Sequence, residues 1–384
     1  MDFDLSDEQR LLKDSVDRLI ADQYGFEQRR AYAKKPEGYD PALWSQYAEL
    51  GLLGLIVPEN NGGAGAGPIE TMIVMEAFGR GLILEPYFAT AVLGGALIRH
   101  AASPEQQNAL LPKLAEGSLK LAFAQMERQS RYDLADVTTC AAQSGMAWKI
   151  DGAKSLVLHG EAADKLLVTA RVSGNQHDRD GIGLFVVDAK ASGVTRRAYA
   201  TQDGSRAVEI TFDAAPAERL GPTANALPAI ERAIDEATAA LCAEAVGAMT
   251  TAHTMTVDYL KTRKQFGRAI GEFQALQHRA VDMYVHLEQA RSMAIFAAMM
   301  AGSDDAAERH RAVAAAKSQI GKSGRALAKE AVQLHGGIGV TMEYAVGHYL
   351  KRLTGIDMTF GDADWHLADV ARAGGLIGTE REPV

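Results

Sequence analysis

Cysteine is scarce in this chain, which has only Cys140 and Cys242 among its 384 residues. A disulfide framework is therefore not implied, and no cysteines and histidines have the spacing of a metal site. Basic residues are also in the minority, because the formal net charge at pH 7 is −9. A nucleic-acid partner is not expected, since phosphates need a basic face. Short basic clusters such as Arg196-Arg197 are expected on solvated faces.

Long hydrophobic runs are missing as well. The apolar stretch from Met293 to Ala301 is shorter than the roughly 20 residues that a helix needs to cross a bilayer. No cleavable hydrophobic segment follows the acidic N-terminus. With 47% hydrophobic and 23% charged residues, the chain can bury a large core and is not expected to be disordered. We therefore expect a cytoplasmic protein without a membrane span.

The sequence pattern divides the chain into three regions, at 1–119, 120–222 and 223–384. In the first, Ser6 and Gln9 have the spacing of a capping box at the start of a helix. Further helices are predicted at Leu43–Leu55, Ile69–Gly79, Phe88–His100 and from Pro104 to about Gly117. The second region changes to short apolar strands at Leu166–Ala170 and Ile182–Val187, an alternating strand around Val208–Phe212, and a hairpin around Asp151-Gly152. These strands predict a small β-barrel or sandwich.

The third region returns to long, Ala-rich helical patterns. They cover Leu227–Leu260, Phe273–Ala301, Ala306–Leu334 and part of Tyr344–Ala373. Four such helices joined by short turns predict an antiparallel four-helix bundle. The expected fold class is α+β, with a helical N-terminal domain, a middle β domain and the C-terminal bundle.

Two segments of the third region carry a more specific pattern. One is Tyr259-Leu-Lys-Thr-Arg-Lys-Gln-Phe-Gly-Arg-Ala-Ile-Gly-Glu-Phe-Gln, and the other is Gln333-Leu-His-Gly-Gly-Ile-Gly followed by Glu343-Tyr344. They resemble the two signature segments of the acyl-CoA dehydrogenase family. The order of the three regions is that of the same family, and the resemblance covers essentially the whole chain.

The resemblance implies that these segments hold the ADP half of an FAD across a subunit interface. Arg263 can offer a bidentate guanidinium to a pyrophosphate, and backbone amides at glycines can approach phosphate oxygens closely. In isolation, a helical arginine is as often a surface ion-pair partner, and a His-Gly-Gly sequence is often a helix stop. The implied cofactor-binding residues are Arg263, Gln265, Phe266, Phe273, Gln274, Gln333, Leu334, Gly336 and Gly337.

The chain departs from the family where the flavin ring would lie. Family members have a threonine, a tryptophan and a second threonine against the ring, and here these positions are Met126, Leu156 and Leu158. Leucine cannot donate a hydrogen bond to a flavin nitrogen, so a purely structural role is favoured for these positions. Other residues of the same two motifs persist, namely Glu127, Asp133, Gly152 and Lys154.

The catalytic base is a further departure, and the catalytic residue stays unassigned. Most family members place a glutamate at the position of Phe360, and a minority place it at the position of Ala237. Neither side chain can accept a proton. Glu236 lies one residue away, which is a rotation of about 100° on a helix. It is an alternative base, although a solvated carboxylate near the helix start is the more ordinary interpretation.

The chain thus keeps the residues that would bind the FAD of a partner subunit, and it lacks those that would form a complete active site of its own. This asymmetry predicts a subunit of an α2β2 acyl-CoA dehydrogenase, most like the smaller, non-catalytic subunit of the pimeloyl-CoA and steroid-degradation type. A homologous partner would hold the base and a bulky steroid-derived or dicarboxylic acyl-CoA, and electron-transfer flavoprotein would accept the electrons. A pocket facing Leu156 and Phe360 would then be filled or narrowed. The alternatives are a self-sufficient homotetramer with Glu236 or another residue as base, and a cofactor-free scaffold.

Overall fold

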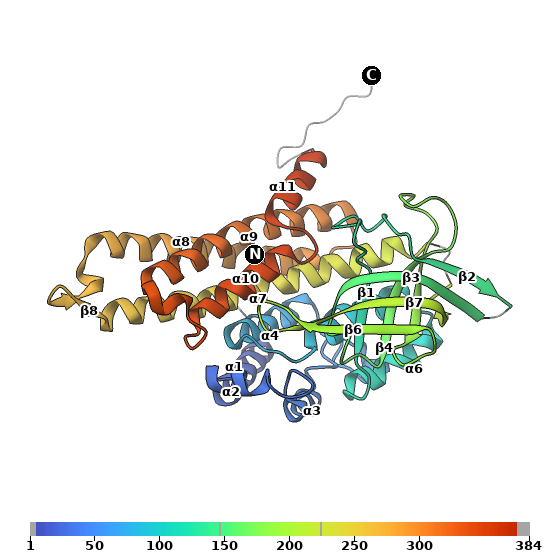
Figure 1. Cartoon of the computed structure of the whole chain (residues 1–384), viewed down its shortest axis with the longest axis horizontal. Coiled ribbons are helices and arrows are strands. Elements are labelled where there is room, and N and C mark those ends of the chain that lie inside the picture. The colour runs from blue at the N-terminus through green and yellow to red at the C-terminus, as the bar shows by residue number, and fades with distance from the viewer. Residues whose placement is uncertain (1–4, 146, 223–224, 375–384) are drawn as a thin grey trace, which may run out of the picture. The chain divides into compact units, whose positions relative to one another are not determined.

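The computed structural model describes residues 5–145, 147–222 and 225–374, which form two compact units (Figure 1). The first unit combines the chain up to Arg29, the segment Pro68–Ile83 and the chain from Thr238 onward. The second unit combines Arg30–Gly67 with Leu84–Ala237. The helical N-terminal region therefore contributes to both units.

The first unit is helical. Its helices are α1 (Asp7–Gln23), most of α2 (Phe26–Tyr32), α4 (Pro68–Gly81), most of α7 (Leu227–Thr262), α8 (Gln274–Ala301), α9 (Ala306–His335), α10 (Val346–Met358) and α11 (Ala363–Arg372). The capping box at the start of α1 is confirmed, because the Ser6 hydroxyl accepts from the Gln9 amide at 3.2 Å and the Gln9 side chain accepts from the Ser6 amide at 3.0 Å. No helix among the described residues is long and apolar enough to cross a membrane.

Close backbone contact joins α4 to α7 within this unit. A Cβ added to Gly79 would lie 2.0 Å from the Glu244 carbonyl oxygen, and one added to Gly247 would lie 1.9 Å from that of Glu76. Both distances are far below van der Waals contact, so only glycine allows this approach. A bidentate ion pair stands beside the crossing, where the Arg352 guanidinium donates to both oxygens of Glu244 at 2.6 and 2.8 Å.

The second unit contains a closed sheet together with α3 (Pro41–Glu49), η1 (Glu59–Asn61), a π-helical turn η2 (Phe88–Gly94), α5 (Gly95–Ala101) and α6 (Pro104–Ala115). The strands are β1 (Leu121–Ala124), β2 (Cys140–Ser144), β3 (Ala147–Leu158), β4 (Lys165–Arg171), β5 (Ile182–Asp188), β6 (Val194–Ala200) and β7 (Arg206–Arg219). Their order is β1-β4-β2-β3-β7-β5, and β5 also pairs with β4. That extra pairing closes the sheet on itself, as a small barrel requires.

The barrel core is apolar and fully buried, with Leu166 and Val168 of β4 and Phe185 and Val187 of β5 among its members. Val208, Ile210 and Phe212 point into it from β7, which confirms the alternating pattern predicted for that strand. The α+β fold class is confirmed by this barrel and the two helical regions.

Several sequence-based predictions of local structure were wrong. Asp151-Gly152 is not a hairpin turn, because β3 runs through it and Gly152, at φ 145°, forms an irregularity in the pairing with β7. The predicted helix at Leu43–Leu55 ends at Glu49, since Leu50 caps it and Gly51 is left-handed at φ 72°. The last helical stretch is two helices, separated at Thr359–Asp362.

Candidate functional site

The two signature segments meet at one end of the helical unit. Tyr259, in the last turns of α7, stacks on His335 at the end of α9 with ring centroids 4.5 Å apart and an interplanar angle of 29°. The ring of Tyr344 lies 5.1 Å from the same histidine. Three aromatic rings from distant parts of the sequence thus fix the segments against each other, and we call this region the bundle end.

A tight hairpin projects from the bundle end. Strands β8 (Lys264–Gln265) and β9 (Arg268–Ala269) pair through a turn in which Phe266 and Gly267 have φ 55° and 80°. Two successive left-handed residues are typical of a type I′ turn. The left-handed backbone is costly for phenylalanine, and Phe266 is nevertheless 90% exposed with its ring edge-on to Phe273 at 6.1 Å. The turn therefore presents an apolar ring to whatever lies outside this chain.

Polar groups at the bundle end are also exposed and available to a ligand. The Arg263 backbone is fixed by hydrogen bonds to Tyr259 and Ile270, both 2.8 Å, whereas its exposed guanidinium bonds to none of the described residues. Gln333 is exposed as well. A Cβ added to Gly336 or Gly337 would meet nothing within 4 Å. The backbone there is open to close approach by a ligand, which fits a phosphate-bearing group.

His335 adds an unsatisfied acceptor to the same region. Its Nδ1 lies 2.7 Å from the Ala331 carbonyl oxygen and donates to it, while its buried Nε2 has no hydrogen-bond partner among the described residues. Burial lowers the pKa of His335, so the ring is neutral and Nε2 carries a lone pair. A buried acceptor without a partner costs free energy.

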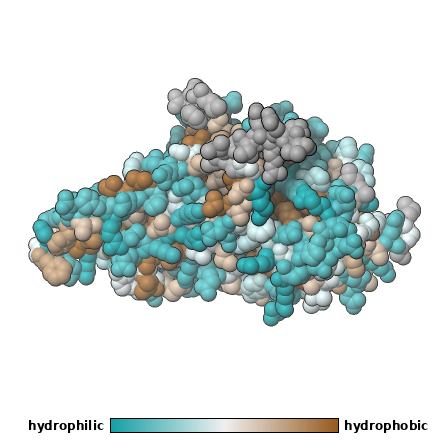
Figure 2. Space-filling model, turned by 90° about the horizontal axis from the view of Figure 1, so that it is seen from above, coloured by the Kyte–Doolittle hydropathy of each residue, from teal (hydrophilic) through white to brown (hydrophobic). Residues whose placement is uncertain are grey.

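Of the other residues that the sequence singled out, Gln265, Phe273 and Gln274 lie in or shortly after the hairpin, and Leu334 lies at the end of α9. Leu334 is only 6% exposed and packs inward, so its side chain belongs to the core. Sequence reasoning missed Arg268, whose guanidinium lies 4.2 Å from the centre of the Phe273 ring. Gln265 and Gln274 are exposed. Apolar surface lies among hydrophilic residues at this end of the unit (Figure 2), where Val340 is 75% and Met342 54% exposed.

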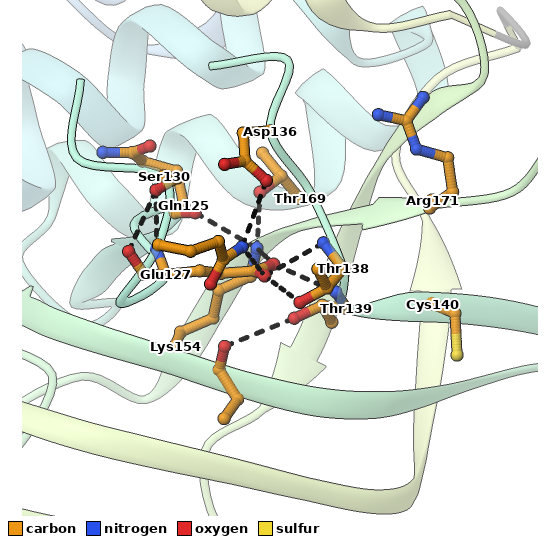
Figure 3. A network of polar contacts seen from close by, with 12 residues as sticks. Gln125, Glu127, Ser130, Asp136, Thr138, Thr139, Cys140, Lys154, Thr169 and Arg171 are labelled. Carbon is orange, nitrogen blue, oxygen red and sulfur yellow. Dashed lines mark hydrogen bonds and ion pairs between the residues drawn. The ribbon is translucent and has the colours of Figure 1, made fainter. Parts of the chain in front are cut away.

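A buried ion pair organises the loop that follows β1 (Figure 3). Lys154 has no exposed surface, and its ammonium donates to Glu127 at 2.8 Å, to Thr169 at 2.9 Å and to the Gln125 carbonyl at 3.1 Å. Glu127 also accepts from the amides of Thr138 and Thr139 at 2.9 and 3.0 Å. Burial alone would raise the pKa of Glu127, but the charge and hydrogen bond of Lys154, together with hydrogen bonds from the side chains of Thr138 and Gln129, outweigh burial and lower that pKa to about 2.

The positions expected to face a flavin ring offer it no polar side chain. Met126 is half-buried, and its carbonyl accepts from the Ser155 amide at 2.8 Å. Leu156 has φ 50° in an irregularity of β3 and is 42% exposed. Leu158 is half-buried in the same strand. The loop and strand keep their scaffold through Glu127 and Lys154, while hydrogen-bonding side chains at Met126, Leu156 and Leu158 are absent.

The three base positions hold no free carboxylate. Ala237 is fully buried, and Phe360 is half-buried with φ 58°. Glu236 is not the solvated helix-start carboxylate that the sequence suggested, because α7 begins nine residues earlier at Leu227 and the carboxylate binds Arg99 and the ring of His100, the latter at 2.6 Å. Burial would raise the pKa of Glu236, but hydrogen bonding by His100 and the charge of Arg99 lower it.

A buried lysine that sequence reasoning missed holds the segment carrying Phe360. Lys317 of α9 is fully buried, and its ammonium donates to the carbonyls of Asp357, Thr359 and Gly361 at 2.8, 3.1 and 2.6 Å. Burial lowers the pKa of Lys317 to about 8, so it is still largely charged at neutral pH. A single cation thus fixes the turn between α10 and α11.

Replacing this lysine should loosen that turn. Lys317→Met keeps the length of the side chain but leaves three buried carbonyls without their donor. We expect the free energy of unfolding to fall by at least about 1–3 kcal/mol, the cost of one unsatisfied buried group. Urea denaturation would measure the change, with Lys322→Met on the exposed face of the same helix as the control. Equal stability of the two variants would show that Lys317 does not hold the turn.

Comparison with known proteins decides the family. Three family models match the chain in succession: the acyl-CoA dehydrogenase N-terminal domain over residues 6–118, the middle domain over 122–215 and the C-terminal domain over 218–375. The acyl-CoA dehydrogenase FadE12 of Mycobacterium tuberculosis H37Rv is 30% identical over 349 residues, which cover 89% of each chain. The chain belongs to the acyl-CoA dehydrogenase family. Members of this family are FAD-dependent oxidoreductases that act on acyl-CoA.

Other members of the family are similar over nearly the whole length. The acyl-CoA dehydrogenase IpdE2 of the same organism is 31% identical over 350 residues, 91% of this chain and 92% of that protein. Among solved structures, a variant of the Tcur3481–Tcur3483 steroid acyl-CoA dehydrogenase has a TM-score of 0.86 at 32% identity, covering 95% of this chain and 97% of that one. The ChsE4–ChsE5 complex from Mycobacterium tuberculosis has a TM-score of 0.88 at 26% identity, covering 99% and 100%.

Proposed function

We propose that this chain is the non-catalytic subunit of an α2β2 acyl-CoA dehydrogenase and that its bundle end clamps the ADP half of an FAD in a homologous partner. An asymmetry within the chain carries the proposal. Exposed groups suited to a nucleotide gather at the bundle end, with Arg263 and the open backbone of Gly336-Gly337 among them. The positions expected to hold the flavin ring and the base instead carry aliphatic or aromatic side chains.

The roles of the residues follow from their chemistry. Arg263 would bind the pyrophosphate, because its planar guanidinium matches two phosphate oxygens. The amides of Gly336 and Gly337 would donate to the same phosphates, and Phe266 would pack against the adenine or ribose. The clamp would be completed by Gln265, Phe273, Gln274, Gln333 and the Leu334 backbone. When bound, FAD supplies the acceptor for a hydride from the acyl thioester.

The partner would supply the base and bind the acyl-CoA. A carboxylate must reach the α-proton of the thioester, and Phe360 and Ala237 cannot accept it. Glu236 is held in a pair with Arg99 and His100, which argues against the homotetrameric alternative that uses it as the base. The proposal therefore assigns this chain no catalytic residue.

The substrate class and the electron acceptor are part of the same proposal. Similarity to the Tcur3481–Tcur3483 steroid enzyme supports a bulky steroid-derived acyl-CoA, with a dicarboxylic acyl-CoA as the other member of the expected class. Electron-transfer flavoprotein is the proposed acceptor in the cytoplasm. A structure described as the electron transferring flavoprotein of Acidaminococcus fermentans includes a chain 25% identical to this one, at a TM-score of 0.88 and full coverage of both chains.

Expression with and without the partner tests the proposal. The full-length chain produced alone should be colourless or insoluble, whereas co-expression with the homologous subunit should give a yellow heteromer that oxidises acyl-CoA. FAD content would be measured by absorbance near the flavin band, and composition by mass. A yellow, active homo-oligomer from this chain alone would instead establish the self-sufficient enzyme, and an active partner whose FAD content is independent of this chain would favour a scaffold.

A further inference from the structure

A separate polar cleft opens on the β unit. It has a volume of about 540 Å³ and is lined by the loop after β1 and by strands β3, β6 and β7. The side chains that matter are Arg128 from the loop, Ser155 from β3, Thr195 and Arg197 from β6, and Glu209 and Thr211 from β7. We call it the arginine cleft. None of these residues belongs to the proposed FAD clamp.

Strand register places these side chains on one face. Arg197 lies directly opposite Glu209 and Thr195 opposite Thr211, so each pair is one step of the β6–β7 ladder. Thr211 in turn faces Ala153 of β3. Side chains two residues apart share a face of a sheet, so the two ladder steps contribute to the same wall. The small side chain of Ala153 leaves room in front of that wall.

The arginines of the cleft form no hydrogen bond or ion pair with the described residues, although Arg128 interacts electrostatically with Glu209. Arg197 forms no hydrogen bond or ion pair with the described residues although Glu209 is its cross-strand neighbour. The carboxylate of Glu209 instead accepts from the Ser155 hydroxyl at 2.9 Å, the Tyr199 hydroxyl at 3.0 Å and the Leu156 amide at 3.3 Å. The guanidinium of Arg128 likewise has no such bond in the described part of the chain, and both arginines are exposed.

Charge in the cleft therefore opposes that of the whole molecule. Three cations line it, namely Arg128, Lys154 and Arg197, against the two anions Glu127 and Glu209, which leaves a net charge of +1. The formal charge of the complete chain is −9. Because Lys154 and Glu127 neutralise each other at 2.8 Å, the remaining charges are the two guanidinium groups of Arg128 and Arg197 and the single carboxylate of Glu209.

We propose that the arginine cleft binds a compact phosphate-bearing anion of the diphosphate class. A guanidinium presents paired donors that match phosphate oxygens, and two of them can engage adjacent phosphates. The hydroxyls of Thr195 and Thr211, which have no hydrogen bonds to the described residues, supply further donors beside Arg197. The diphosphate could be free or part of a nucleotide, and both present the same group to the arginines. This site does not depend on the role proposed for the bundle end.

Calorimetric titration of the purified full-length protein tests this site, with inorganic pyrophosphate and ADP as the probes. We expect binding that weakens with salt and that falls at least about tenfold in Arg128→Gln/Arg197→Gln, since each charge-assisted contact contributes roughly 1.5–3 kcal/mol. All titrations are made in an Arg263→Gln background, because the bundle end is itself proposed to bind the ADP half of FAD. Binding that this background retains is assigned to the cleft. Adding Lys149→Gln/Lys190→Gln to the background removes two exposed charges elsewhere in the same unit and should leave that binding unchanged.

Each result of the titrations either supports the proposed site or overturns it. Tighter binding of ADP than of pyrophosphate would place a nucleoside in the cleft, and equal binding would assign the cleft to the diphosphate alone. Absence of binding by the Arg263→Gln protein would overturn the proposal, as would binding that survives when Arg128→Gln/Arg197→Gln is added to it. Loss of binding in Arg263→Gln alone would move the anion to the bundle end and also overturn it. Both cleft arginines are exposed, and equal urea midpoints would verify that their variants fold.

Discussion

Arg263→Ala should strip FAD from the complex of this chain with its partner. The guanidinium is exposed and bonds to none of the described residues, so its loss removes no internal contact. A charge-assisted, bidentate contact to a pyrophosphate contributes about 1.5–3 kcal/mol. The affinity of the complex for FAD should therefore fall roughly 10- to 100-fold, and the purified protein should lose most of its yellow colour.

The neighbouring Lys264 provides the control for this experiment. It is also exposed and cationic and lies in β8, one residue further along. Lys264→Ala should retain FAD, because an ammonium lacks the forked geometry of a guanidinium. FAD released by heating would be quantified for both variants of the co-purified complex. Undiminished FAD in Arg263→Ala would remove the central support for the clamp and would revive the interpretation of this chain as a scaffold.

Local sequence signals predicted the regular elements well and the irregular ones poorly. Ser6 and Gln9 define the start of α1 because their contacts lie within one turn. Helices α7 to α9 are so long that their helical period predicts them even where single residues do not fit the pattern. The Asp151-Gly152 pair has the composition of a turn, but pairing of β3 with β7 on both sides keeps it within a strand. A glycine in a strand can mark an irregularity as well as a turn, and only the distant partner strand decides between them.

The residues that organise the candidate sites show the same limit. Lys317 lies in an Ala-rich helix and bonds to carbonyls about 40 positions further on, so nothing in its neighbourhood indicates its burial. Glu236 finds Arg99 and His100 more than a hundred residues earlier. The exposed residues of the bundle end were accessible to sequence reasoning because a ligand site is encoded in a short motif. Whether those residues hold FAD stays a prediction.

Lys154→Met should strongly destabilise the β unit. It leaves the carboxylate of Glu127 buried, charged and without its counter-ion. Breaking a buried pair from one side costs about 3–5 kcal/mol. Urea denaturation would measure the loss, with Lys149→Met on the exposed face of the same strand as the control. A Lys154→Met variant as stable as this control would show that the pair does not hold the loop.

A double variant separates the unpaired charge from lost packing. Glu127→Gln/Lys154→Met should regain at least half of the stability, because the buried charge is gone and the single amide oxygen of glutamine still accepts from one of the two backbone amides, of Thr138 or of Thr139, that donate to Glu127. The stability that Glu127 contributes should decrease at acid pH. Since the pKa of Glu127 is lowered to about 2 in the folded protein from about 4.3 in an unfolded chain, its stabilisation is complete above the latter value and is lost as pH falls toward 2. The double variant should show a flatter acid limb than the wild type, and identical limbs would place the acid-sensitive group elsewhere.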